Sequence, residues 1–240
     1  MGWGEILTSK ITVIIPSLNS AARIMPTLAC LIAPMADGLI KKVIFADGGS
    51  TDITADIAEE TGASFVSTPK GRGMQCKIGV IFAIQSDWLL FLHDDSQLSN
   101  DWGNEVASFV RNPSNINKCA YFKLALDDSS IKAKIVAWGA NMRCKIFALP
   151  YGDQGLLISR KLYEEIGGFG TMPLMEDVDI IERIKTKIGK QNLIMLKAVL
   201  TTSADKYKDG YAKRVWRNFK YLRAYKNGTD PKEIAESYYK

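Results

Sequence analysis

Short apolar segments alternate with longer amphipathic stretches along the first hundred residues of the chain. Each segment has five or six residues; 11–16 is rich in β-branched side chains, and 88–92 is a continuous apolar run typical of a strand buried on both faces of a parallel sheet. The stretches between them have the length of helices, and this alternation predicts right-handed βαβ units. We expect strands at 11–16, 42–46, 63–68 and 88–92, and helices at about 19–32, 50–62 and 71–82.

The pattern changes after residue 100, where helical periodicity becomes more frequent. No internal repeat and no linker rich in proline or serine divides the chain, so we expect one domain over residues 1–240. In this second half we expect helices at about 101–110, 131–147, 161–166 and 178–187, and strands near 119–126 and 155–159.

Apolar residues recur on one face of a predicted C-terminal helix, at Tyr211, Val215, Phe219 and Leu222, and basic residues occupy much of the rest. The pattern fits a helix that packs its apolar face on the domain and leaves its charges in water. It also fits a helix that lies on an anionic membrane surface. Contact with nucleic-acid phosphates is the third interpretation, and we do not expect a nucleic-acid partner.

The composition is that of a folded protein in a reducing compartment. Apolar residues make up 47% of the chain and charged residues 24%, which excludes wholesale disorder. The four cysteines are far apart and form no CxxC pair, so we interpret them as free thiols. The first ten residues do not follow a signal-peptide pattern. We predict a cytoplasmic protein, with a peripheral position at the inner membrane surface if the basic helix binds lipid.

Acidic residues follow directly on the apolar segment 88–92, in the order His93, Asp94 and Asp95. Open α/β sheets bind their ligands at the carboxyl ends of the strands. Two adjacent carboxylates there are suited to a hard divalent cation that takes its other ligands from water and phosphate. The alternative is that these acids only begin a turn or cap the next helix. His93 is the only histidine, so a multi-histidine metal site is excluded.

A second acidic turn, 47–52, follows the second predicted strand. Asp47 at the strand end is suited to accept a hydrogen bond from a ribose hydroxyl or a base N–H. Gly48 and Gly49 would let the backbone approach a ligand closely. The plainer alternative is a turn followed by a helix cap.

The third predicted helix begins at the sequence Gly71-Arg72-Gly73, which offers a flexible cationic edge for a phosphate or simply a solvated loop. We expect this helix to bury one apolar face, made of Met74, Ile78, Ile81 and Phe82.

Taken together, these motifs resemble family 2 glycosyltransferases of the GT-A fold. The similarity covers about residues 11–203 and is greatest to a small soluble subgroup with a Gly-Arg-x-x-Gln helix start and a His-x-Asp metal motif. The segments that carry it are 14–19, 46–52, 71–75, 93–95, 151–155 and 175–179.

The resemblance implies an α/β fold of the GT-A type, a Rossmann-like sandwich with a mostly parallel central sheet flanked by helices. The C-terminal basic amphipathic helix, predicted from its own pattern, would follow this fold. It divides the single domain into functional parts. We expect a nucleotide-binding half at 11–100, an acceptor and catalytic half at 101–203, and a basic helical segment at 204–240.

The resemblance also implies a donor site for a nucleotide-diphosphate sugar and a bound Mn²⁺ or Mg²⁺. Asp95 matches the metal-binding acid of the family, with His93 at the first position of that motif. Asp94, between them, is either an extra ligand or points away. For the donor the resemblance implies Pro16 and Asn19 beside the nucleotide, Asp47 on the base, Gly49 at the close approach, and Arg72 and Gln75 near the nucleotide and its phosphates.

The implied reaction is an inverting, metal-dependent transfer of a sugar to a hydroxyl group. Asp177 is the predicted general base, and Glu176 either supports it or belongs to the acceptor site. Both acids could instead merely satisfy a helix N-terminus. Gln154 would contact the acceptor or orient the base. The acceptor is unknown and could be lipid-linked, a saccharide or a small molecule.

Two alternatives remain at this point. A nucleotidyltransferase has a similar sheet and similar metal chemistry, but it would carry a glycine-rich loop after the first strand, where 16–20 has no glycine. A nucleotide-sugar-binding module without catalysis is disfavoured because Asp95 and Asp177 are present. A dinucleotide-dependent oxidoreductase is disfavoured because no G-x-G-x-x-G motif follows a strand.

Overall fold

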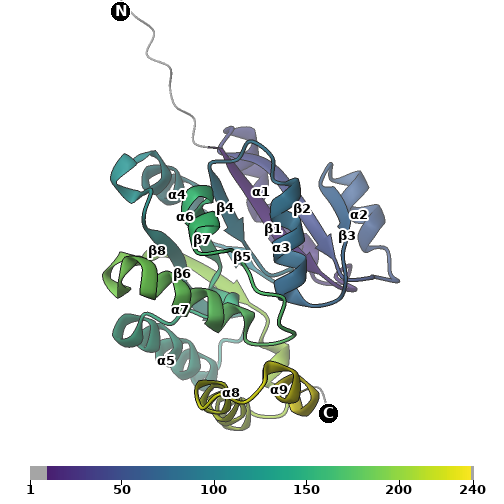
Figure 1. Cartoon of the computed structure of the whole chain (residues 1–240). Helices are drawn as coiled ribbons and strands as arrows, with labels where there is room; N and C mark the ends of the chain where they lie inside the picture. The colour runs from purple at the N-terminus through teal and green to yellow at the C-terminus, as the bar shows by residue number, and fades with distance from the viewer. Residues whose placement is uncertain (1–9, 239–240) are drawn as a thin grey trace, which may run out of the picture.

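The computed structural model describes residues 10–238, which form one α/β sandwich around a single sheet (Figure 1). Within this part of the chain the strand order is β3-β2-β1-β4-β7-β6-β8-β5. The strands are β1 (Ile11–Ser17), β2 (Ile40–Asp47), β3 (Ser64–Ser67), β4 (Trp88–Phe91), β5 (Gln97–Leu98), β6 (Cys119–Leu126), β7 (Leu156–Ser159) and β8 (Leu193–Thr202).

Helices cover both faces of the sheet. Residues of α1, α2 and α4 belong to one hydrophobic cluster, and residues of α3, α5, α6 and α7 belong to the cluster on the other face. The helices are α1 (Ile24–Ala36), α2 (Thr54–Glu60), α3 (Arg72–Phe82), α4 (Trp102–Arg111), α5 (Ile131–Phe147), α6 (Arg160–Glu165), α7 (Glu176–Ile188), α8 (Tyr211–Lys226) and α9 (Pro231–Tyr238).

The first half of the sheet is parallel, as predicted. β1 pairs in parallel with β2 and with β4, and β2 pairs in parallel with β3. The second half is mixed, because β7 runs antiparallel to both β4 and β6 while β6 and β8 are parallel. The carboxyl ends of β1, β2 and β4 therefore meet at one edge, where the loops that carry the candidate residues begin.

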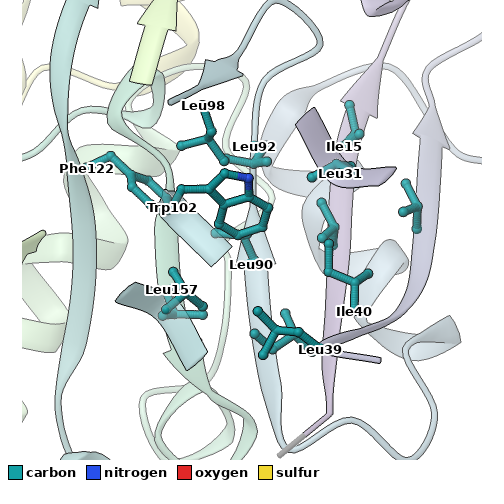
Figure 2. Packing of buried hydrophobic residues seen from close by; sticks show 14 of the residues in the cluster. Ile15, Leu31, Leu39, Ile40, Leu90, Leu92, Leu98, Trp102, Phe122 and Leu157 are labelled. Carbon is teal, nitrogen blue, oxygen red and sulfur yellow. The ribbon is translucent and has the colours of Figure 1, made fainter. Parts of the chain in front are cut away.

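The cluster on the α1 and α4 face has a large aromatic centre (Figure 2). The indole of Trp102 is 1% exposed and lies edge-on to Phe122, with ring centroids 6.3 Å apart. Leu90, Leu92 and Leu157 complete this layer around it. Burial of each such leucine contributes about 1.5–3 kcal/mol, so this layer holds β4, and the acids that follow it, in a rigid frame.

The prediction of which face of α3 is buried is wrong. Ile81 and Phe82 are 68% and 43% exposed, whereas Cys76 and Gly79 face the sheet. A Cβ on Gly79 would lie only 2.6 Å from Cγ2 of Ile14. The missing side chain thus lets the helix approach β1 closely, and this contact decides which face is buried.

The structure also differs from the sequence prediction at the starts of two helices and in one whole strand. α1 begins at Ile24 rather than near residue 19, because the preceding residues form a loop at the sheet edge. α7 begins at Glu176, two residues earlier than expected. β8, a ten-residue strand, was not predicted at all, although it pairs with both β6 and β5.

The C-terminal segment folds as α8 and α9, with α8 in contact with α5 (Figure 1). The expected apolar stripe on α8 is divided between its two sides. Leu222 packs inward against the domain, whereas Val215 and Phe219 are 46% and 51% exposed. Among the described residues, no helix has the length and apolar character needed to cross a membrane.

Candidate active site

The candidate site lies at the sheet edge where β1, β2 and β4 end. Ser17 is opposite Asp47 in the β1–β2 register, and Ile14 is opposite Phe91 in the β1–β4 register. The acidic turn after β4 therefore lies beside the loops after β1 and β2, as the parallel sheet predicts.

Asp47 is occupied by its own turn. The side chain is 2% exposed, and its Oδ2 accepts hydrogen bonds from the backbone N–H groups of Gly49 and Ser50, at 2.9 and 2.7 Å. Its Oδ1 accepts from the hydroxyls of Ser17 and Ser50, at 3.2 and 2.5 Å. A carboxylate has about four acceptor positions, and here all are used. The predicted direct contact with a base therefore has no support in this geometry.

The loops after β1 and β2 are held together by Asn19. Its Oδ1 accepts a hydrogen bond from the Thr51 N–H at 2.8 Å, and its own N–H donates to Ser50 Oγ at 2.8 Å. Asn19 has a φ of 49°, a left-handed conformation that asparagine tolerates better than most residues. Gly49 has a φ of 98°, which favours glycine. Asn19 and Gly49, both predicted to lie at the binding site of the sugar donor, thus shape the exposed loops after β1 and β2.

The side chain of Gln75 joins the carboxyl ends of β1 and β2. Its Nε2 donates to the carbonyl oxygens of Ser17 and Ala46, at 2.7 and 2.8 Å, and the residue is 4% exposed. This amide joins the ends of β1 and β2 instead of presenting its donors to a ligand. Pro16, which is also buried, lines a cavity on the α3 side of the sheet.

Arg72 and Glu176 form an ion pair across the site, with Arg72 Nε 2.9 Å from Glu176 Oε1. The arginine side chain is 41% exposed, whereas that of the glutamate is 5% exposed. Burial raises the pKa of Glu176 to about 6, against the opposing effect of Arg72 and with a further contribution from Asp177. The pair connects the start of α3 with the start of α7.

Asp95 points toward the end of β8. Its Oδ2 accepts hydrogen bonds from the Thr202 hydroxyl at 2.8 Å and the Ser203 N–H at 3.3 Å, and Lys206 Nζ lies 3.9 Å from the same oxygen. Burial pushes the pKa of Asp95 upward, but Lys206 and these hydrogen bonds outweigh it, so the pKa is below the ordinary value. The other oxygen, Oδ1, is buried and has no hydrogen-bond partner.

His93 is neutral, because burial, assisted by Arg72 and Lys206, lowers its pKa to about 3. A Cβ placed on Gly152 would lie 2.8 Å from His93 Nε2 and 3.5 Å from Asp177 Oδ2. Glycine at this position therefore allows the imidazole and the Asp177 carboxylate to approach the same point. A neutral imidazole is also the form that binds metals.

Asp94 turns away from its neighbour Asp95. Its carboxylate pairs with Arg23, whose Nη2 lies 2.7 Å from Oδ2, and also accepts a hydrogen bond from Ser20. Of the two possibilities that the sequence left open, the structure thus favours the one in which Asp94 points away. Its contacts anchor the acidic loop to the segment before α1.

Asp177 is oriented by the backbone. Its Oδ2 accepts a hydrogen bond from the Gly152 N–H at 2.9 Å, and its Oδ1 accepts from the Val178 N–H at 2.8 Å. Each oxygen keeps further acceptor capacity, since a carboxylate has about four lone-pair positions. Met175, before it, has a φ of 67° and turns the chain sharply into α7. The side chain is therefore fixed in direction at the start of the helix.

Gln154 lies beneath the site and not in it. The residue is fully buried; its Oε1 accepts a hydrogen bond from Arg143 at 3.1 Å, and its Nε2 donates to the Phe122 carbonyl at 3.2 Å. It lines neither of the cavities at the site. The predicted contact with the acceptor therefore has no support, because the side chain serves the packing between α5 and β6.

Two cavities adjoin these residues. We call them the inner cavity, which is largely apolar and extends over Pro16, Cys76 and Phe91, and the outer cavity, which extends toward α8 and α9. Arg72, His93, Tyr151 and Asp177 line both cavities. The outer cavity is also lined by residues that the sequence analysis did not single out, among them Lys206, Tyr207, Arg214 and Tyr221.

These additional residues follow β8, the strand missed from the sequence. The apolar run 193–200, bounded by a helix and by Thr201 and Thr202, was the signal that could have revealed it. Its parallel pairing with β6 brings the segment 202–206 beside Asp95.

Three buried carboxylate oxygens of the described residues have no hydrogen-bond partner. Asp95 Oδ1, Asp153 Oδ1 and Glu176 Oε2 are three of the five buried side-chain atoms without a hydrogen-bond partner among residues 10–238. Buried polar atoms nearly always have partners, so each orphaned acceptor calls for a group that supplies donors or positive charge. Glu176 lines the inner cavity and Asp153 the outer one, whereas Asp95 lines neither. The open oxygen of Asp95 suits a divalent cation.

The protein by itself offers few metal ligands. Within the described part of the chain, no three His, Cys, Asp or Glu residues are grouped as a metal cage. Asp95, with His93 nearby, fits a cation that is held by one or two protein ligands and completed by water and substrate phosphates, as is usual for Mg²⁺.

A sheet whose parallel half ends in acid-bearing loops at one edge is typical of α/β nucleotide-binding proteins. The chain belongs to glycosyl transferase family 2, because the model of that family matches residues 12–161. An uncharacterized glycosyltransferase from Rickettsia bellii (strain RML369-C) is 34% identical over 102 residues, which are 42% of this chain and 33% of that relative. The chain thus spans about a third of the curated relative that it matches.

Solved structures confirm the predicted GT-A-type fold. Glucosyl-3-phosphoglycerate synthase from Mycobacterium tuberculosis, in complex with Mn²⁺, UDP-glucose and phosphoglyceric acid, is similar with a TM-score of 0.58 and 19% identity, over 81% of this chain and 70% of that chain. The complex of the same enzyme with Mg²⁺ and UDP gives a TM-score of 0.56 and 20% identity, with the same coverage of both chains.

Proposed function

We propose that this protein is an inverting, metal-dependent glycosyltransferase that moves a sugar from a nucleotide-diphosphate donor to a hydroxyl group. Family membership supports the reaction class. The observation that carries the proposal is the buried Oδ1 of Asp95, which follows the end of β4 and has no hydrogen-bond partner. Such an acid would hold a divalent cation, which would stabilise the charge on the leaving diphosphate.

The donor nucleotide would lie over the loops after β1 and β2. Asp47 would act there indirectly, since its hydrogen bonds hold the turn in which Gly49 is exposed. Asn19 would fix the neighbouring loop through Thr51. The proposed nucleotide-binding half, 11–100, therefore provides a pre-formed edge rather than a set of free side-chain donors.

The diphosphate would leave with help from Asp95 and nearby cationic side chains. A Mn²⁺ or Mg²⁺ ion bound there supplies Lewis-acid stabilisation of the leaving group. Asp95 would hold this ion, and His93, two residues earlier, would offer an uncharged ring nitrogen. Arg72 at the start of α3, and Lys206 beyond β8, would add positive charge to the same region.

Asp177 would act as the general base. Its backbone hydrogen bonds aim the carboxylate at the point that Gly152 leaves open, where both cavities meet. In the reaction the acceptor oxygen bonds to the anomeric carbon as the bond to the diphosphate oxygen breaks, and Asp177 takes the hydroxyl proton. Glu176, paired with Arg72, would support the site without touching the reacting atoms.

The outer cavity would receive the acceptor. Its lining includes the cationic residues Arg72, Lys206 and Arg214 together with several tyrosines, which is suited to a hydroxylated molecule that carries an anionic group. The structurally similar synthase was solved with phosphoglyceric acid, an anionic acceptor of this kind. The proposed acceptor half, 101–203, therefore needs the segment 204–240 to complete its cavity.

A cytoplasmic location remains a prediction. The four cysteines are free thiols, and Cys76, Cys119 and Cys144 are buried, which agrees with a reducing compartment. Peripheral association with a membrane also remains a prediction. The exposed apolar and basic residues that support it lie on α5 as well as on α8.

A thermal-shift screen tests the donor proposal. UDP-, GDP- and dTDP-sugars would each be added with Mn²⁺ and with EDTA. A ligand that binds only the folded state, at about 100 times its dissociation constant, adds about 2.7 kcal/mol to the free energy of unfolding. We expect one nucleotide class to stabilise the protein in Mn²⁺ and much less in EDTA. If no nucleotide sugar stabilised the protein with either addition, the proposed function would be wrong.

Cleavage of the stabilising donor would then be followed with and without small anionic hydroxy acids. We expect these acids to accelerate release of the nucleoside diphosphate and to yield a glycosylated product of inverted anomeric configuration.

A further inference from the structure

The helices α5 and α8 expose large apolar side chains on their outer faces. On α8 these are Val215, Trp216 and Phe219, at 46%, 67% and 51% exposed, and the rings of the last two lie 6.1 Å apart. On α5 they are Ile131, Ile135, Trp138, Ile146 and Phe147, with exposed fractions of 56% to 75%. An isolated exposed hydrophobic residue is ordinary, but a concentration of this kind marks an interaction surface.

The same two helices carry a concentration of positive charge. Together they contain ten lysines and arginines and no acidic residue, so the remaining 207 residues of the chain have a net charge of −5. On α8 the exposed basic residues Lys213, Lys220 and Arg223 lie among the exposed aromatic ones. On α5, Lys132, Lys134 and Lys145 are exposed in the same way.

The two helices are neighbours at one end of the molecule (Figure 1). α8 has two distinct sides, because Arg214, Asn218 and Tyr221 line the outer cavity while Trp216 and Phe219 face solvent. One helix thus separates the candidate acceptor cavity from the exposed apolar surface. A helix with its side chains is about 10–12 Å across, which sets the distance between them.

We propose that the outer faces of α5 and α8 form a docking surface for an anionic lipid membrane. Basic residues interleaved with exposed tryptophan, phenylalanine and isoleucine are the composition of a helix that lies in the interfacial layer. The lysines and arginines meet the negative headgroups, and the aromatic rings enter the boundary with the acyl chains. This proposal does not depend on the transfer activity.

Other occupants fit the surface less well. A second copy of this chain would bring two strongly positive faces together, which costs free energy. Nucleic acid would meet the charges, but bases stack on aromatic rings and gain little from the exposed isoleucines Ile131, Ile135 and Ile146. Lipid is suited to both the charge and the aliphatic side chains.

Docking in this way would place the outer cavity next to the membrane surface. An acceptor headgroup held by a lipid could then reach the cavity across the width of α8, and a water-soluble acceptor would still enter freely. The surface would therefore raise the local concentration of membrane-held acceptors without changing the chemistry at Asp177.

Vesicle flotation with the purified full chain tests the proposal. We expect binding to vesicles of phosphatidylcholine with phosphatidylglycerol, weak binding to phosphatidylcholine alone, and release at high salt. Trp138→Ser combined with Trp216→Ser should weaken binding to the anionic vesicles about tenfold or more. Lys213→Gln, Lys220→Gln and Arg223→Gln together should do the same and should reduce the salt dependence.

Matched control variants lie elsewhere on the surface. Ile81→Ser with Ile84→Ser removes side chains that are 68% and 69% exposed, and these two variants together should bind vesicles like the wild type. For the charges, the control is Lys77→Gln with Lys161→Gln and Lys190→Gln, which are exposed lysines outside α5 and α8.

The proposal is overturned if the wild type fails to bind anionic vesicles, or if the control variants lose binding as the test variants do. It is also overturned if the tryptophan variant abolishes self-association or binding of a single-stranded oligonucleotide while vesicle binding is unchanged. Circular dichroism of each variant would show that the fold is retained.

Discussion

The Thr202 hydroxyl donates a hydrogen bond to Asp95 Oδ2 at 2.8 Å, which joins two residues that are 107 positions apart in the chain. It leaves the other oxygen of Asp95 open and fixes its direction. A partner of this kind orients a metal-binding carboxylate, and its loss typically costs about 10–100-fold in metal affinity.

We therefore predict that Thr202→Val weakens Mn²⁺-dependent nucleotide binding about tenfold or more. Asp95→Asn should abolish the Mn²⁺-dependent part, so that affinities in Mn²⁺ and in EDTA become equal by isothermal titration calorimetry. Thr201→Val, the neighbouring residue on β8, is the control and should leave binding unchanged. If the wild type bound the nucleotide equally well in Mn²⁺ and in EDTA, the assignment of a metal ion to Asp95 would be wrong.

Asp177→Asn separates catalysis from binding. The amide keeps the shape and can still accept the Gly152 hydrogen bond, but it cannot take a proton. We expect kcat to fall about 100-fold or more while the KM for the donor stays nearly constant, because a general base acts mainly in the transition state. Glu176→Gln should cost less, since Glu176 is paired with Arg72. If both Asp177→Asn and Glu176→Gln had normal turnover, neither Asp177 nor Glu176 would take part in the mechanism.

Asp47→Ala tests the donor turn. Loss of the carboxylate leaves the N–H groups of Gly49 and Ser50 without their acceptor, and should lower the free energy of unfolding by about 1–3 kcal/mol. Because the turn shapes the nucleoside side of the site, uridine and UDP should both bind more weakly, as measured by calorimetry. If only ligands with a diphosphate weakened, Asp47 would belong to the phosphate or metal region.

The stability of the protein should depend on the protonation of Glu176. Burial raises its pKa from 4.5 to about 6, so the neutral form favours folding. The stabilisation is complete below about pH 4.5 and is lost as the pH rises through about 6, a change of up to about 2 kcal/mol. Glu176→Gln should remove this part of the pH dependence in chemical denaturation. Glu164→Gln, at an exposed carboxylate, should retain the wild-type slope.

Gly79→Ala should destabilise the fold. The new Cβ would lie 2.6 Å from Ile14 Cγ2, so α3 would have to move away from β1, at a cost of about 1–3 kcal/mol in unfolding free energy. Gly139→Ala on α5 is the matched control, because a Cβ there meets nothing within 4 Å. It should be neutral or stabilise by up to about 1 kcal/mol. Equal unfolding midpoints for both variants would contradict this account of the α3–β1 contact.

Local pattern was sufficient for the first half of the fold. Each strand from β1 to β4 is a short apolar run, and the parallel order follows from the helices between them. The buried face of α3 was predicted wrongly, because hydrophobicity favoured Ile81 and Phe82, whereas close packing at Gly79 decided the orientation. β8 was missed because its pairing with β6 is not visible in any local segment.

The sequence by itself determined that acids follow the strand ends and that the motifs are those of a family 2 glycosyltransferase. Only the tertiary structure decided what each acid contacts. Asp94 turns to Arg23 and Asp95 to Thr202, although the two acids are adjacent in the chain. The physical reason is that hydrogen bonds and burial depend on partners brought together by the sheet.

The same reason explains Gln154 and Lys206. The first looked like a binding residue but is enclosed between α5 and β6, and the second had no distinguishing motif but lies 3.9 Å from Asp95. A side chain's chemistry is written in the sequence, but its neighbours are set by the folded chain, and those neighbours determine whether the side chain is free to bind a ligand.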